Sequence, residues 1–294
     1  MPHPGWTEFS FDGIGTRWEI STPSPLPGRH RRRLLEVVAD YDAAWSRFRP
    51  DSLVAGAARQ PGSFQLPAGA AALGPLYGTL YRLSNGAMTP LIGGSLEQLG
   101  YDAAYSLRPA GPPLPAPRWE DVLDWDGTVL TTSKPVVIDV GAAGKGQLAD
   151  LLSAELLAGG IGEHFIDASG DLLNSAPDPG TAPVEVALEH PYDSSRAIGM
   201  ISLGAGALCA SAANRRAWGD GLHHVLDGST GAPVRTVVAS WAMAGTAMVA
   251  DALATALFFV EGARLREEFD FSWLTVYTDG HAEYSTDFEG VLFS

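Results

Sequence analysis

The sequence predicts an α+β protein with mixed, largely antiparallel sheets and flanking helices. The first reason is a series of short apolar runs separated by glycine-containing turns, which is the pattern of β-hairpins. The second reason is a smaller number of stretches whose apolar residues recur at helical spacing. The third reason is the size of the chain, because 294 residues with 46% hydrophobic content can bury a large core.

The chain is expected to begin with two strands and a long helix. Alternating apolar residues predict a pair of short strands between residues 7 and 22, turning at a glycine-containing segment. After a proline-rich linker, apolar spacing predicts a helix from about residue 29 to residue 45, and Pro50 prevents its continuation. Asp51 or Ser52 can cap a short helix beyond it, and a polar loop should follow.

The middle of the chain is expected to hold a helix, a loop-rich crossing and a hairpin. Apolar spacing predicts the helix over residues 69–85, with Asn85-Gly86 as its C-terminal cap. Residues 88–102 are rich in glycine and predict a turn with a short helix, while the prolines of residues 109–117 indicate a surface crossing. An Asp-Gly pair within residues 125–129 predicts the hairpin.

The stretch from Val136 to Asp171 is expected to form a strand, a tight loop and a helix. An apolar run, Val136 to Ile138, leads into the turn GAAGKG at residues 141–146, and leucines at helical spacing follow. Glycines and a helix N-terminus favour an anion, and Lys145 adds a cation, so a phosphate would fit there. An ordinary turn with a surface lysine is the alternative. The spacing matches neither a P-loop nor a Rossmann fingerprint.

Short strands and one terminal hairpin are predicted for the rest of the chain. No repeat and no long linker divides the sequence, so residues 1–294 are expected to form a single domain. The predicted strands are residues 163–167, 183–188, 197–203 and 207–210, and the hairpin pairs residues 273–278 with residues 282–285 around Asp279-Gly280.

Composition excludes several classes of function. The formal net charge of -15 argues against a nucleic-acid partner, and the basic run Arg29 to Arg33 is interpreted as a solvated helix face. A single cysteine, Cys209, excludes an internal disulfide and a zinc site built from several cysteines. No window is apolar enough for a membrane span, and residues 1–15 lack leader and lipid-attachment signals. We therefore expect a cytoplasmic protein.

Two further stretches carry residues suited to catalysis. Residues 221–234 predict a strand, an Asp/Gly turn and a second strand, in which His223 or His224 can serve as a general base or be structural. In the apolar helix predicted around residues 248–260, Asp251 and Thr255 share one face. A hard cation would suit that carboxylate. The alternative is a helix N-cap for Asp251 and a hydroxyl bonded to its own helix for Thr255.

In this order the motifs resemble the FAD:protein FMN transferase (ApbE-like) family. The resemblance covers most of the chain, including Ile14-Gly15-Thr16, Trp45-Ser46-Arg47-Phe48 and Leu99-Gly100-Tyr101-Asp102. Its main motifs are DVGAAGKGQLAD, DASGD, HHVLDGSTGAPV and VADALATALF. The chain departs from the usual family pattern at Gly144, at Gln147, over residues 210–214 and at Gly228.

The resemblance implies an FAD cleft between two lobes and a magnesium-dependent enzyme with FAD as substrate. Such an enzyme transfers FMN through a phosphoester to a threonine of an acceptor flavoprotein with a threonine-containing motif, and releases AMP. Some members mainly hydrolyse FAD, and a non-catalytic flavin-binding protein is a further alternative. The implied Mg²⁺ ligands are Gly144, Asp251 and Thr255, and the implied catalytic residues are His224 and Lys145. The implied FAD-binding residues are Ile14, Phe48, Tyr101, Asp102, Lys145, Gly146, Asp150, Ser169, Gly170 and Asp171.

Overall fold

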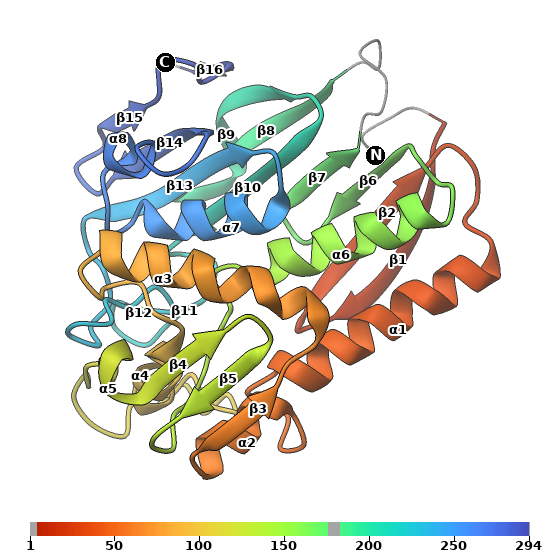
Figure 1. Cartoon of the computed structure of the whole chain (residues 1–294). Coiled ribbons are helices and arrows are strands. Elements are labelled where there is room, and N and C mark those ends of the chain that lie inside the picture. The colour runs from red at the N-terminus through yellow and green to blue at the C-terminus, as the bar shows by residue number, and fades with distance from the viewer. Residues whose placement is uncertain (1–4, 176–182, 294) are drawn as a thin grey trace.

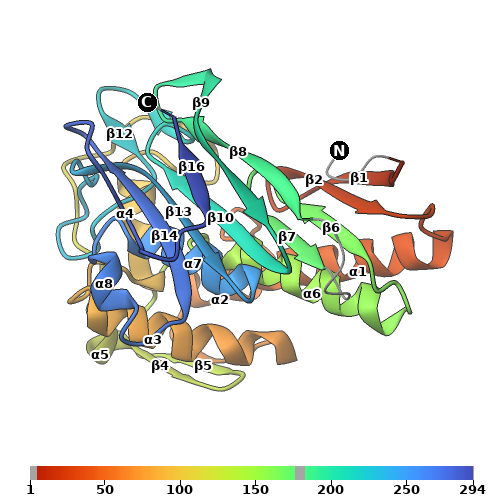
Figure 2. The ribbon, with the colours of Figure 1, turned by 90° about the horizontal axis from the view of Figure 1, so that it is seen from above.

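A computed structural model describes residues 5–175 and 183–293, so the first residues of the N-terminal segment lie outside the described part of the chain. A large sheet forms the middle of three layers, with helices on one face and a smaller sheet on the other (Figures 1 and 2). Neighbouring strands of the large sheet pair antiparallel. In spatial order they are β1 (Thr7–Gly13), β2 (Thr16–Thr22), β6 (His164–Asp167), β7 (Leu172–Ser175), β10 (Gly206–Ala212), β13 (Val237–Ala244), β14 (Phe271–Tyr277) and β15 (Ala282–Tyr284).

The other described elements complete the layers around this sheet. The smaller sheets are β16 (Gly290–Leu292), β9 (Asp193–Leu203) and β8 (Val184–His190); β3 (Gly62–Gln65), β5 (Val129–Thr132) and β4 (Leu123–Asp126); and β11 (Ala217–Trp218) with β12 (Leu222–His223). The α-helices are α1 (Gly28–Trp45), α2 (Leu53–Arg59), α3 (Leu73–Leu83), α4 (Gly93–Gln98), α5 (Trp119–Val122), α6 (Gly144–Ala158), α7 (Ala247–Ala256) and α8 (Gly262–Leu265). Two 3₁₀-helices are η1 (Ala68–Ala72) and η2 (Pro90–Ile92).

Separate apolar cores join the layers. The largest lies between the large sheet and its helices and includes Trp18 of β2, Leu152 of α6 and Leu253 of α7, all fully buried. A second core joins Trp241 of the large sheet to Ile201 of the β16-β9-β8 sheet. Because α7 lies between the sheet and other helices, it is apolar around most of its circumference. No helix of the described residues is long and apolar enough to cross a membrane.

Most predicted elements are present, which confirms the α+β class with antiparallel sheets. The first two strands, the long helix and the terminal hairpin are β1, β2, α1, β14 and β15. Ser52 caps α2 by accepting a hydrogen bond of 3.1 Å from the Ala55 nitrogen. Gly86 closes α3 by donating from its nitrogen to the Tyr81 carbonyl oxygen at 2.8 Å.

Two local predictions are wrong. Val136 and Ile138 are buried, but residues 136–138 form no strand, since the Val136 nitrogen donates to the Ala57 carbonyl, near the end of α2, instead of to a neighbouring strand. A short apolar run does not distinguish a strand from other buried backbone. Within residues 221–234 only the two-residue β12 and an isolated bridge are formed. The other backbone hydrogen bonds of this segment belong to turns and loops and do not extend a strand.

Five strands of the described residues were not predicted, namely β3, β7, β11, β13 and β16. Strand β3 occupies part of the expected polar loop, and β7 pairs between β6 and β10. The central strand β13 is buried along Val237–Trp241 on both faces, so its sequence lacks the apolar-polar alternation that marks a half-exposed strand.

His164 is a buried polar link between β6 and α6. Its side chain is fully buried, with Nε2 2.8 Å from the Ser153 hydroxyl of α6 and Nδ1 3.2 Å from the Ile161 carbonyl oxygen. A carbonyl only accepts, so Nδ1 carries the proton and Nε2 accepts from the hydroxyl. Burial lowers the pKa of His164 to about 4, and the imidazole is therefore neutral in the folded protein.

We expect His164 to weaken the fold in acid. Between the ordinary pKa of 6.5 and the folded pKa of about 4, the unfolded chain binds a proton that the folded chain does not. The free energy of unfolding should therefore decrease as the pH is lowered through this window, by up to about 3 kcal/mol. Urea titrations between neutral pH and pH 4 measure this slope. His164→Gln should reduce this slope, and the exposed-site control His281→Gln should retain it. An identical slope in wild type and His164→Gln would contradict the assignment.

Candidate active site

Two adjoining cavities, of about 320 and 440 Å³, lie beside the N-terminus of α6. One side is formed by turns and strand ends of the large sheet, including Ser169 and Ser211. The other side includes Leu96, Tyr101 and Trp218, which belong to a separate small core and so form a second lobe. The cleft between the lobes was expected from the sequence. The residues that line both cavities are Gly15, Tyr101, Asp139, Gly141, Lys145 and Arg216.

Helices α6 and α7 cap each other beside the cleft. Asp251 of α7 accepts a hydrogen bond of 2.9 Å from the Gly146 nitrogen in the first turn of α6. In return, the carboxylate of Asp150 on α6 accepts from the Ala247 and Met248 nitrogens in the first turn of α7, at 2.8 and 2.9 Å. The first-turn N–H groups of a helix have no partner within that helix and carry the positive end of its dipole, so they attract a carboxylate. The first turn of α6 therefore holds Asp251, and the first turn of α7 holds Asp150.

Lys145 lies in an ion pair with the buried Asp171 of the segment after β6. The second carboxylate oxygen of Asp171 accepts from the Ala210 nitrogen at 3.3 Å. Burial disfavours the charge of Lys145, but the nearby carboxylates of Asp171 and Asp251 outweigh it and raise the pKa of Lys145 above its ordinary value. A permanent cation thus lies at the junction of the two cavities.

Asp251 and Thr255 line the same cavity from one face of α7. The N-cap of α7 is Thr246, so Asp251 lies inside the helix and the N-cap alternative is wrong. The Thr255 hydroxyl bonds to the Ser211 hydroxyl of β10 at 2.9 Å, across elements instead of within its own helix. The side chain of Asp251 is almost fully buried. Burial first, and the charge of Asp171 second, raise the pKa of the Asp251 carboxyl well above its ordinary value.

The two histidines have different surroundings. His223 is tied to the backbone, with Nε2 2.8 Å from the Val234 carbonyl oxygen and Nδ1 accepting from the Val225 nitrogen at 3.3 Å. His224 lines the cavity, and its buried Nδ1 has no hydrogen-bond partner among the described residues. Burial, followed by the charge of Arg216, lowers the pKa of His224 to about 3. His224 is therefore neutral at physiological pH.

Two turns with left-handed backbone form one wall of the cleft. Ile14 and Gly15, at φ 42° and 78°, make the turn between β1 and β2. Ser169 and Gly170, at φ 57° and 101°, make the turn between β6 and β7. The Thr16 hydroxyl donates to the Ser169 hydroxyl at 2.6 Å, which joins the two turns. The glycines in these turns meet a backbone requirement that L side chains satisfy poorly.

Aromatic rings surround the larger cavity. Phe48 stacks on Tyr105 at a centroid distance of 5.2 Å, and Tyr101 stacks on Trp218 at 5.7 Å. Beneath them the Arg47 guanidinium lies 4.2 Å from the Phe48 ring centroid and 5.0 Å from that of Tyr101. Such faces suit a planar aromatic ligand group.

Arg47 and Asp139 were not predicted as site residues. The Arg47 Nε lies 2.6 Å from Asp139 Oδ2, and Asp139 Oδ1 accepts from the Gly141 nitrogen at 2.7 Å. Burial alone would raise the pKa of Asp139, but the Arg47 charge holds it below the ordinary value. The sequence signal was an acid directly between a buried apolar run and a glycine turn. Arg216, Tyr105 and Trp218 carried no such signal.

Four predicted residues, Asp102, Gly146, Asp150 and Asp171, lie behind the walls of the two cavities instead of lining them. Asp102 organises the rim loop, because its Oδ1 accepts from the Ala104 and Ser106 nitrogens at 2.9 and 3.0 Å. Asp150 caps α7, as described above, and Gly146 is the point of closest approach between α6 and α7. Gly144 lines the larger cavity, as do Ile14, Phe48 and Tyr101.

The fold and the cleft together place the chain in a class of α+β proteins in which the binding cleft lies between two lobes, beside the glycine-rich N-terminus of a helix. The chain belongs to the ApbE family, whose family model matches residues 14–270. It is 30% identical over 278 residues to a FAD:protein FMN transferase from Rhodobacter capsulatus. That match covers 87% of this chain and 51% of the relative, so the chain spans about half the length of the curated relative it matches.

Solved structures share the same fold. The ApbE protein from Thermotoga maritima is 25% identical, covers 97% of this chain and 99% of its own, and superposes with a TM-score of 0.82. The flavin transferase ApbE from Vibrio cholerae is 20% identical, covers 96% of this chain and 98% of its own, and gives a TM-score of 0.78. The family predicted from the sequence motifs is therefore confirmed.

We expect Gly146→Ala to disrupt the contact between α6 and α7. A Cβ at residue 146 would overlap the Ala247 carbonyl oxygen and lie 2.8 Å from the Asp251 Cβ. Separating the helices should lower the free energy of unfolding by about 3 kcal/mol. The matched control is Gly78→Ala in α3, where nothing lies within 4 Å, and it should be neutral or stabilising by up to about 1 kcal/mol. Chemical denaturation measures both. Equal stability of the two variants would refute this close approach.

Proposed function

We propose that this chain is a Mg²⁺-dependent FAD:protein FMN transferase that releases AMP and links FMN through a phosphoester to a threonine of an acceptor flavoprotein. The observation that carries the proposal is one cavity lined by Lys145, the Asp251-Thr255 pair and His224, whose Nδ1 has no hydrogen-bond partner among the described residues. Membership of the ApbE family and the name of the Rhodobacter capsulatus relative support it.

The proposed cation site consists of oxygen donors. It takes the Asp251 carboxylate, the Thr255 hydroxyl and the Gly144 carbonyl, the ligand types that Mg²⁺ prefers. No three His, Cys, Asp or Glu side chains cluster as a metal site among the described residues, which accords with a donor set containing only one acid. The elevated pKa of the buried Asp251 fits as well, since a carboxylate in such surroundings requires a positive partner. Bound Mg²⁺ would stabilise negative charge on the diphosphate oxygens.

His224 is the proposed base. Its Nδ1 is buried, so Nε2 is the nitrogen left to take the proton of the acceptor threonine hydroxyl. Lys145 keeps its charge and holds a phosphate oxygen from the junction of the cavities. Neither group needs to change its protonation state before FAD binds.

The remaining predicted residues are proposed to hold FAD directly or through others. Ile14, Phe48 and Tyr101 border its rings, and Ser169 and Gly170 face the nucleotide from the turn joined to that of Ile14. Four other predicted residues are proposed to act on FAD only indirectly, by holding in place the parts of the cleft that contact it. These are Asp102 through the rim loop, Asp150 and Gly146 through the two helices, and Asp171 through Lys145.

Residues 1–294 would act as a single catalytic domain in the cytoplasm. Fractionation of the producing cells tests the location. Purified chain with FAD and Mg²⁺ tests the activity, and AMP is the expected product. With an acceptor bearing a suitable threonine motif, FMN should become covalently attached. AMP with free FMN only would indicate an FAD hydrolase, since water can replace the threonine. Absence of AMP under both conditions would leave a non-catalytic flavin-binding protein and reject the enzyme.

We expect Asp251→Asn to abolish the Mg²⁺-dependent release of AMP. The amide is nearly isosteric but carries no charge, so turnover should fall by about 100-fold or more. The second readout is binding, because Mg²⁺ should raise the melting temperature of the wild type and leave that of Asp251→Asn unchanged. Asp124→Asn, an exposed substitution on β4 with the same charge loss, is the control. Wild-type Mg²⁺ dependence in Asp251→Asn would remove this residue from the metal site.

A further inference from the structure

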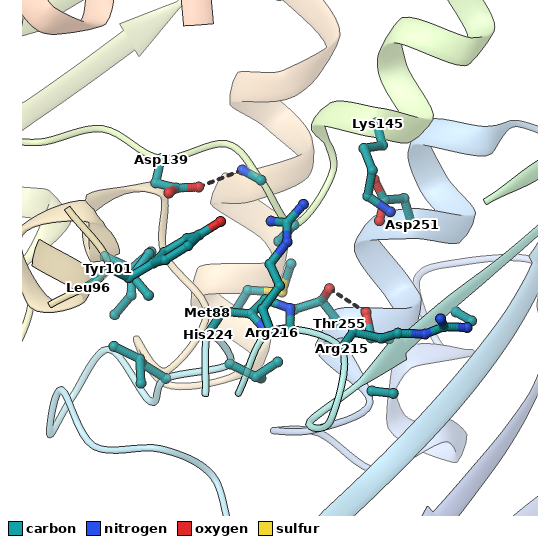
Figure 3. Close-up of a pocket in the computed structure, with 18 of the residues that line it drawn as sticks. Met88, Leu96, Tyr101, Asp139, Lys145, Arg215, Arg216, His224, Asp251 and Thr255 are labelled. Carbon is teal, nitrogen blue, oxygen red and sulfur yellow. Dashed lines mark hydrogen bonds between the residues drawn. The ribbon is translucent and has the colours of Figure 1, made fainter. Parts of the chain in front are cut away.

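Arg216 projects into the centre of the cleft. It belongs to the segment between β10 and β11 and lines both cavities. Figure 3 shows its guanidinium in the space between Asp139 on one side and Lys145 and Asp251 on the other. A group bound across the junction of the two cavities would therefore pass beside it.

The other cations of the cleft already have partners. Arg47 pairs with Asp139, and Lys145 with Asp171. The neighbouring Arg215 points away from Arg216 in Figure 3 and pairs with Glu189 at 2.8 Å. Arg216 makes no hydrogen bond or ion pair with any residue in the described ranges, and its side chain is exposed to the cleft. Its donors are available for a ligand.

The charge of Arg216 acts on acids and bases on both sides of the cleft. It contributes to the lowered pKa of Asp139 and of His224, and it opposes the rise in the pKa of Asp251. These groups come from three separate segments of the chain. Their common response places the guanidinium within electrostatic reach of Asp139, His224 and Asp251.

A diphosphate is the ligand group that fits this position. A guanidinium presents a planar fork of donors that matches two phosphate oxygens at once. A dinucleotide has a ring system at each end and its diphosphate in the middle. With one ring system in each cavity, the diphosphate lies at the junction, where Lys145 and Arg216 line both cavities.

We infer that Arg216 binds the diphosphate of FAD and neutralises the AMP phosphate as it leaves. This inference rests on the proposed function. In that step the threonine oxygen forms a bond to the FMN phosphorus, and the bond from this phosphorus to the bridging oxygen breaks. AMP leaves with the bridging oxygen and its electron pair. The threonine proton goes to Nε2 of His224. Arg216 donates hydrogen bonds throughout and keeps its own protons.

Binding of ADP without Mg²⁺ tests Arg216 separately from turnover. By calorimetry, Arg216→Gln should bind ADP about tenfold more weakly than the wild type, because a charge-assisted hydrogen bond is lost. Arg216→Lys should recover part of this loss, since it keeps the charge but not the fork. Arg235→Gln, exposed and outside the lining of both cavities, has the same charge loss and should bind ADP as the wild type does. Adenosine should bind wild type and Arg216→Gln equally.

Turnover provides the second measurement. Arg216→Gln should lower kcat/KM for AMP release by about 100-fold. Unchanged ADP affinity in Arg216→Gln would overturn the inference whatever its rate, and so would an equal loss of adenosine affinity, which indicates a distorted cavity. If the wild type releases no AMP from FAD, the proposed function fails. The ADP comparison still decides whether Arg216 binds a diphosphate.

Discussion

The reciprocal capping of α6 and α7 is the constraint on which the cleft depends. Asp251 and Asp150 each satisfy backbone donors of the opposite helix, and Gly146 allows the two backbones to approach. Carboxylates that complete helix N-termini are held by fixed dipoles instead of by flexible side chains. The proposed metal ligand Asp251 and the cation Lys145 therefore lie on two helices that cannot move independently.

Electrostatic balance within the cleft differs from that of the whole chain. The formal net charge is -15, but the cleft contains Arg47, Lys145 and Arg216, of which the first two pair with Asp139 and Asp171. These ion pairs hold two of the cations in place without requiring a ligand. An anion entering the cleft meets preorganised donors and little reorganisation cost, which is the condition for electrostatic stabilisation of a leaving phosphate.

Much of the fold followed from local physics. Turn glycines, apolar spacing and the Ser52 cap located most helices and hairpins, and the ordered motifs led to the correct family. Two of the failures share a cause. Val136, Ile138 and the residues Val237–Trp241 of β13 are buried, and an apolar sequence there does not reveal whether a strand or a helix end will be the neighbour.

The sequence by itself determined the class of fold, the family and the residue types available for chemistry, because these are encoded in local spacing and motif order. Only the tertiary structure decided which side chains meet. It bonds His223 to backbone and, within the described part of the chain, leaves Nδ1 of His224 without a hydrogen-bond partner. It also makes Asp150 the cap of α7 and brings Arg216 to the junction of the cavities. Such outcomes depend on contacts between segments distant in sequence, and hydrogen-bond partners at long range leave no local pattern.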